Sequence, residues 1–221
     1  MPTIRVEVCT LNIQDMNWTK SLLLIATIWF FILSGCGPKD VTTDPEELSA
    51  ASKSWIPFEG NESVTFVFDT SKMVFTGTGK ESFFETVRYK TDQGGLFNFQ
   101  EDYYADLERE TLGFLSPSTP FYFSYYLEKN KGVTGDWDIL RVTISEGIYY
   151  SNEMKIVISE SDDFDKGDNF KFKASLALNG TTYTDVYYWK QERRPFELYY
   201  TKSHGIIGFK LSSNELWTLQ P

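Results

Sequence analysis

The sequence predicts an all-β domain, either an antiparallel sandwich or a half-open barrel of about a dozen short strands. Apolar residues alternate with polar ones, as in Leu140, Val142 and Ile144, and this period of two is typical of a strand with one buried face. Asn179-Gly180 separates two such runs and favours a type I′ hairpin turn. After Ser54 no long stretch carries the apolar stripe of a helix.

The strands follow from the alternating runs between turn-forming residues. In chain order they are predicted at Ser63–Asp69, Lys72–Gly77, Phe84–Lys90, Leu96–Gln100, Tyr103–Thr111, Pro120–Leu127, Leu140–Ile144, Met154–Ser159, Phe170–Leu178, Thr181–Trp189, Phe196–Tyr200, Ile206–Leu211 and Glu215–Leu219. Gly94-Gly95 and Ser212-Ser213-Asn214 predict two further hairpins. Glu46–Lys53 could form two helical turns. The acidic run Asp162–Asp168 is interpreted as a solvated hairpin loop, because it lacks the ligand spacing of a calcium loop. Weak calcium binding is the alternative.

Residues 54–221 have the length of one domain. The chain has a net charge of −10, and nucleic-acid binding needs a basic face to neutralise phosphate. The composition therefore argues against a nucleic-acid partner.

The N-terminal region has the layout of a secretory signal. Lys20 precedes an apolar run, Ser21 to Ile32, which ends in Leu33-Ser34-Gly35-Cys36. The run is too short for a comfortable membrane span. It resembles the bacterial lipoprotein signal (lipobox), which implies cleavage after Gly35 and lipid attachment at Cys36. Residues 1–35 are then the signal peptide, and the membrane is a partner through the lipid on Cys36.

Residues 1–15 fit this signal poorly because they carry Glu7 and Asp15. Met16 would begin an ordinary signal peptide. We therefore interpret residues 1–15 as an over-extended start, which leaves Cys9 without a role.

Residues 36–53 are predicted to be a flexible acidic tether, because they are rich in proline, threonine and acidic side chains. Gly37 stands where an aspartate would retain an enterobacterial lipoprotein in the inner membrane, so the resemblance favours the outer membrane. Lys39-Asp40 partly resembles the surface-export signal of Bacteroidota lipoproteins. Both the periplasmic face and the cell surface remain open.

Two predicted strands are aromatic on both faces, Pro120–Leu127 and Thr181–Trp189. Such strands are either covered on both sides or form the wall of a binding surface. The candidate binding residues are Tyr122, Tyr125, Tyr126, Tyr183, Tyr187 and Trp189.

No pattern predicts a catalytic centre, a metal site or a cofactor. His204 is the one histidine, no Gly-x-Ser-x-Gly motif accompanies it, and one histidine without a free thiol cannot form a zinc site of the usual kind. Gly77-Thr78-Gly79-Lys80 lacks the spacing of a phosphate-binding loop.

The ends of the domain resemble small uncharacterised lipoproteins of Bacteroidota. The resemblance lies in the Trp-x-Pro segment at Trp55 and in the Tyr-Tyr, Gly-Ile-Ile-Gly-Phe and Trp segments between Tyr199 and Trp217. It implies a localisation, and it offers no activity that could be carried over to this chain. We expect a non-enzymatic envelope lipoprotein that binds another envelope protein or an extracellular polymer, such as a glycan, through its aromatic strands. The alternatives are a carrier of an apolar ligand in a half barrel, as in lipocalin-like or lipoprotein-carrier folds, and a polysaccharide hydrolase.

Overall fold

The computed structural model describes residues 40–92, 101–132, 135–147, 150–158, 170–191, 196–210 and 213–220. The chain divides into two units, one of residues 1–41 with 91–102 and one of residues 42–90 with 103–221. The larger unit holds the sheet and its core. No helix among the described residues is long and apolar enough to cross a membrane.

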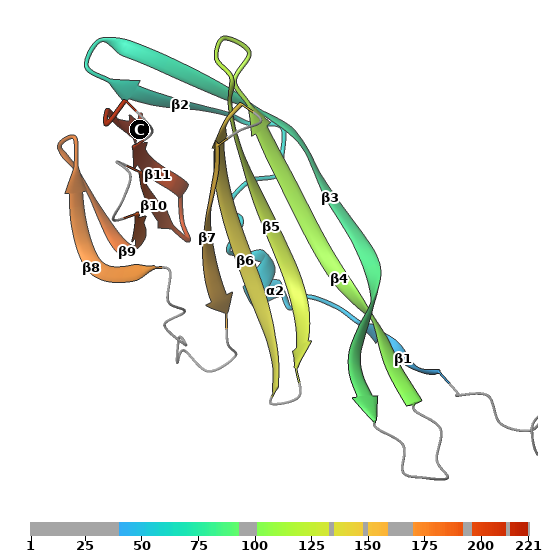
Figure 1. Cartoon of the computed structure of the whole chain (residues 1–221). Coiled ribbons are helices and arrows are strands. Elements are labelled where there is room, and N and C mark those ends of the chain that lie inside the picture. Colours follow the sequence, from blue (N-terminus) through green and yellow to red (C-terminus); the bar gives the residue numbers. More distant parts are fainter. Residues whose placement is uncertain are drawn as a thin grey trace, which may run out of the picture. The chain divides into compact units, whose positions relative to one another are not determined.

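The larger unit is an antiparallel sheet that curls into a half-open barrel (Figure 1). Eleven strands follow one another in the order β7-β6-β5-β4-β3-β2-β12-β11-β10-β9-β8, and β1 pairs with β4 beside this path. The strands are β1 (Val41–Glu46), β2 (Ser63–Phe68), β3 (Ser71–Asp92), β4 (Glu101–Leu115), β5 (Phe121–Gly132), β6 (Gly135–Glu146), β7 (Tyr150–Ile158), β8 (Lys171–Leu178), β9 (Thr181–Lys190), β10 (Glu197–Thr201), β11 (Gly205–Lys210) and β12 (Leu216–Leu219). The all-β prediction is confirmed, and of its two architectures the half-open barrel is the one observed.

The alternation in the sequence corresponds to the two faces of this sheet. In β6, Leu140, Val142 and Ile144 are fully buried in the core, as the period of two predicts. Asn179 and Gly180 form the β8–β9 turn with φ of 46° and 81°, which confirms the predicted hairpin. The β11–β12 pairing is also confirmed. The predicted Gly94-Gly95 turn, the strand Leu96–Gln100 and the loop Asp162–Asp168 lie outside the described residues.

One prediction is corrected in β3, which is a single strand of 22 residues where two strands were expected. The strand continues through Gly77 and Gly79, whose backbone N–H groups donate to Glu62 and Gly60. A Cβ on Gly77 would lie 2.3 Å from the carbonyl oxygen of Gly60. These glycines therefore allow a close backbone crossing, and they do not end the strand.

The segment predicted as a tether is also corrected in part. Within it β1 covers Val41–Glu46, and α2 covers Ala50–Lys53 with Ser49 as its N-cap. Leu48 is buried in the core. The folded unit therefore begins before Ser54, because polar residues can form a strand when a neighbouring strand supplies the hydrogen bonds.

The core lies on the concave side of the barrel and is rich in aromatic rings. Ring centroids of Phe66, Phe75, Phe114, Phe123 and Phe209 lie 4.6 to 6.4 Å from their neighbours. A second, smaller cluster holds Leu178, Tyr183, Val186 and Ile207.

Candidate functional site

The aromatic strand β5 presents two different faces. Phe123, Tyr125 and Leu127 point into the core, whereas Tyr122 and Tyr126 lie on the opposite face and are not buried. Tyr125 is 1% exposed, and its hydroxyl accepts a hydrogen bond of 3.1 Å from the backbone N–H of Ile206. Burial raises the pKa of this hydroxyl far above its usual range. Tyr125 is therefore part of the packed core of the half-open barrel.

The candidate residues of β9 are also largely covered. Tyr187 contacts Trp55, with 5.4 Å between ring centroids, and Trp189 packs on Phe196 at 5.1 Å. Tyr183 belongs to the second cluster and meets the ring of His204 edge-on. The structure thus brings Tyr125, Tyr187 and Trp189 together in one core. The six candidate residues do not form one continuous surface.

The concave side of the barrel is filled by the chain's own N-terminal segment, Leu48–Phe58. Trp55 stacks on Tyr200 and its carbonyl oxygen accepts a hydrogen bond from the Tyr200 hydroxyl. Phe58 packs against Phe114 at 5.1 Å and against Tyr125 at 5.8 Å. This segment therefore occupies the space where an apolar ligand of a half barrel would lie.

A buried carboxylate of β4 holds this segment. Glu108 accepts hydrogen bonds of 2.8 Å from the backbone N–H of Leu48, 2.7 Å from Lys53 Nζ and 2.7 Å from Ser82 Oγ. Burial alone would raise the pKa of Glu108, but the three hydrogen bonds outweigh it and lower the pKa. Glu108 is therefore a charged clamp on the N-terminal segment.

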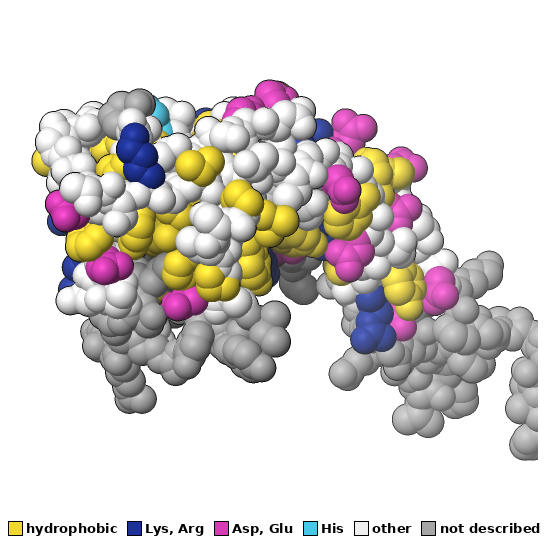
Figure 2. All heavy atoms as spheres, turned by 90° about the horizontal axis from the view of Figure 1, so that it is seen from above, with side chains coloured by type: hydrophobic (Ala, Val, Ile, Leu, Met, Phe, Trp, Pro, Cys, Tyr) yellow, Lys and Arg dark blue, Asp and Glu magenta, His cyan; other side chains and the backbone are white. Residues whose placement is uncertain are grey.

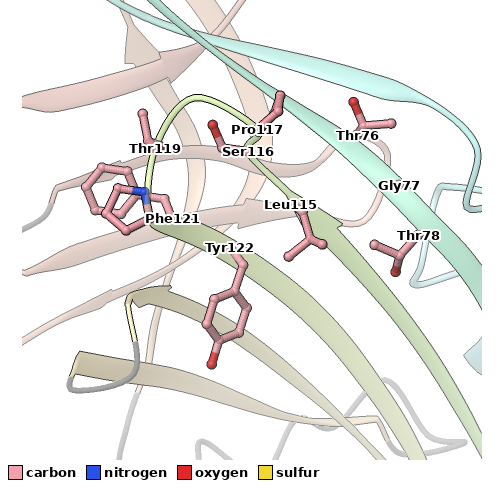
Figure 3. A pocket seen from close by; sticks show the side chains of 10 residues that line it. Thr76, Gly77, Thr78, Leu115, Ser116, Pro117, Thr119, Phe121 and Tyr122 are labelled. Carbon is pink, nitrogen blue, oxygen red and sulfur yellow. The ribbon is translucent and has the colours of Figure 1, made fainter.

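Beside the β4–β5 turn, the start of β5 is exposed and lines a groove of about 510 Å³. It is lined by Thr76, Gly77, Thr78, Leu115, Ser116, Pro117, Thr119, Pro120, Phe121 and Tyr122. None of these residues carries a charge. Leu115 and Tyr122 are paired in the sheet and point to the same side (Figure 3). They are 54% and 36% exposed.

The turn that shapes the groove is fixed by its own backbone. Ser116 N–H donates to Phe121 O at 3.2 Å, and Gly147 N–H donates to Pro120 O at 2.8 Å. Figure 2 looks from above onto this end of the barrel and shows hydrophobic side chains that reach the surface, with acidic and basic side chains at several places around them. The groove is therefore a preformed, uncharged and mainly apolar surface.

Tyr126 lies further along the same face, among charged groups. Arg109 bonds Glu85 at 3.0 Å and approaches Glu128 at 3.3 Å, and Arg141 bridges Glu128 and Glu153 at 2.8 and 2.9 Å. This ion-pair network crosses five neighbouring strands. Tyr126 therefore lies beside charged groups, between them and the groove. Of the six predicted binding residues, Tyr122 alone lines the groove.

His204 lies in the β10–β11 turn and is exposed. Its Nδ1 is 2.8 Å from Ser203 Oγ, and its backbone N–H donates to Thr201 Oγ1 at 3.2 Å. These contacts fit a turn. Within the described part of the chain, no group of three or more His, Cys, Asp or Glu residues is placed to hold a metal ion.

Sequence reasoning missed the residues that form the filled concave side of the barrel and the groove at the β4–β5 turn. Glu108 gave no signal because it lies in a run of charged residues, and the N-terminal segment showed only the apolar residues around Trp55 after a polar stretch. The groove joins Thr76–Thr78 to Leu115–Tyr122, which lie far apart in the sequence. Only the pairing of β3 with β4 brings them together.

Comparison with protein-family models, with curated proteins and with solved structures finds no match to this chain.

Proposed function

We propose that this protein is a non-enzymatic lipoprotein of the bacterial cell envelope that binds another envelope protein or an extracellular polymer through the groove beside Tyr122. The observation that supports this most is the contrast within β5. Tyr125 is buried beneath the N-terminal segment, whereas Tyr122 and Leu115 are exposed in an uncharged groove. Exposed aromatic and aliphatic side chains in a concave site are the usual anchors of a binding surface.

The chemistry of the groove suggests the kind of ligand. Its hydroxyl groups come from Thr76, Thr78, Ser116, Thr119 and Tyr122, and its remaining lining is apolar. A charged ligand would lose hydration there without gaining a partner of opposite charge. An uncharged segment of a protein or a neutral polymer therefore suits it best. Hydrolysis of a polysaccharide would need two carboxylates at the bond that is cleaved, and none of the ten lining residues is acidic.

The groove can be tested by cross-linking in the intact envelope. A photo-reactive residue in place of Leu115 should form a defined adduct, because position 115 faces the ligand. Val74, which is 40% exposed and does not line the groove, is the matched control position. Tyr122→Ala should weaken the adduct at position 115 at least about tenfold, the effect of removing a binding anchor. Equal adducts at positions 115 and 74 would contradict the proposal.

The membrane anchor is proposed to be the lipid on Cys36, and Cys36→Ser tests it separately. Two or more acyl chains give stable attachment, so the variant should move from the membrane fraction to the soluble fraction. Continued membrane attachment of Cys36→Ser would count against the anchor and would leave the groove untouched.

Carriage of an apolar ligand is the second candidate function, and the fold itself favours it. A half-open barrel with an aromatic concave side is suited to enclosing such a ligand. In this structure Trp55 and Phe58 fill that side. A carrier would therefore have to displace the segment Leu48–Phe58 and break the bonds of Glu108, which makes this function the less favoured one.

A further inference from the structure

Strand β1, the first strand of the described chain, meets the barrel at the start of β4. Thr43 Oγ1 donates to the carbonyl oxygen of Tyr104 at 3.4 Å, and Glu46 forms an ion pair with Lys131 of β5. These contacts fix residues 43–46 to one end of the sheet. The fold therefore defines the point at which a membrane anchor would be connected to the domain.

The length of chain before this position limits how far the domain can stand from its anchor. Thr42 comes six positions after Cys36, and an extended chain spans at most about 3.5 Å per residue. With the lipid of the proposed function on Cys36, Thr42 lies within about 20 Å of the lipid attachment. The start of β4 must then stay close to the bilayer surface.

Two tyrosines and two lysines lie together at this end of the sheet. Tyr89 and Tyr103 lie 6.3 Å apart between ring centroids. Lys90 Nζ lies 4.8 Å from the ring centre of Tyr103, and Lys131 Nζ lies 4.8 Å from that of Tyr89. We name these four residues the tyrosine–lysine cluster. Tyrosine and lysine combine an apolar body with a polar tip, and both are favoured at the headgroup level of a bilayer.

The groove lies at the other end of the same strand. From Tyr103 to Leu115, β4 rises about 3.3 Å per residue, which places the two about 40 Å apart. Both residues belong to the larger unit. A bilayer at the tyrosine–lysine cluster would therefore leave the groove free.

We propose that the tyrosine–lysine cluster rests on the bilayer interface and that the groove beside Tyr122 faces away from the membrane. The inference depends on the lipid at Cys36, which brings the cluster to the surface. In this orientation one end of the barrel contacts the membrane and the opposite end contacts the partner.

Fluorescence quenching by lipid tests this orientation. The lipidated protein is reconstituted in vesicles of phosphatidylethanolamine and phosphatidylglycerol that contain a spin-labelled headgroup lipid. The two cysteines of the sequence are Cys9 and Cys36. The first lies in the removed segment and the second is acylated, so a fluorophore can be placed at one new cysteine. The Arg88→Cys variant carries the label beside the tyrosine–lysine cluster. The Ser118→Cys variant carries it in the exposed turn at the groove.

We expect strong loss of fluorescence for the label at position 88 and none for the label at position 118. Tyr89→Ala with Tyr103→Ala should reduce the quenching at position 88, whereas Tyr122→Ala should leave it unchanged. Equal quenching at positions 88 and 118, or quenching at 118 alone, would overturn the orientation. Failure of the wild-type chain to float with the vesicles would instead overturn the lipid at Cys36, and the orientation with it.

Discussion

Gly205 has surroundings that leave little room for a side chain. It has a φ of +70°, and a Cβ there would lie 2.5 Å from Phe58 and 2.6 Å from the Tyr125 hydroxyl. The glycine therefore allows the N-terminal segment to pack against β5 and β11 at the same point. It combines a backbone requirement with a packing requirement.

Gly205→Ala is expected to destabilise the protein more than Gly180→Ala. Gly180 also has a positive φ, of 81°, but no atom lies within 4 Å of the place that a Cβ would take there. The alanine at 180 should cost about 1–2 kcal/mol from the backbone alone. The alanine at 205 should cost about 1–3 kcal/mol more, because it overpacks the core. Urea unfolding of the two variants measures the difference, and equal midpoints would show that Phe58 does not pack on Gly205.

At the residue scale, the sequence predicts which side chains share a face of a strand better than it predicts which face binds a ligand. The alternation in β5 separates Tyr122 from Tyr125, because successive side chains point to opposite faces. It does not tell which face is concave, since both carry aromatic rings. The structure settles this through Phe58 and Ile206, which contact Tyr125. Neither residue is near β5 in the sequence.

Residues 41–53 form the part of the described chain that the sequence predicts least well. Residues 36–53 have the composition of a tether, and residues 41–46 contain a proline. Pairing with β4 nevertheless makes them a strand, and Glu108 fixes the turn that follows. Tertiary hydrogen bonds here override the local preference. The opposite holds for β8 and β9, where Asn179-Gly180 specifies the hairpin locally.

Glu108→Gln should loosen this element and change its response to acid. The lowered pKa means that Glu108 binds a proton less readily in the folded protein than in the unfolded chain, where the pKa is near 4.5. The ionised Glu108 therefore contributes its full stabilisation above about pH 4.5. This stabilisation is lost as the pH falls through the lowered pKa. We expect the variant to lose about 1–3 kcal/mol near neutral pH.

The difference between wild type and Glu108→Gln should shrink as the solution is acidified. Urea unfolding between neutral and acidic pH measures it, with Glu81→Gln, an exposed carboxylate of β3, as the control. A difference that stays constant down to the lowest pH would show that Glu108 is not the group that clamps Leu48 and Lys53.

At the scale of the whole molecule, the half barrel gives the chain two distinct ends. The tyrosine–lysine cluster and β1 lie at one end of β4, and the groove lies at the other. The sequence predicted an antiparallel all-β domain but left sandwich and barrel open. The choice depends on β2 pairing with β12, strands about 150 residues apart in the sequence. No local pattern encodes such a contact.

The barrel is filled by its own chain, and we propose that binding takes place outside it. A native mass spectrum of the domain from Asp40 onward, purified from its own host without detergent, tests this most directly. We expect the bare polypeptide mass, or a bound mass that disappears in a Leu115→Asp variant. Extra mass that persists in Leu115→Asp and is released only on denaturation would place an apolar ligand inside the barrel and contradict this view of the protein.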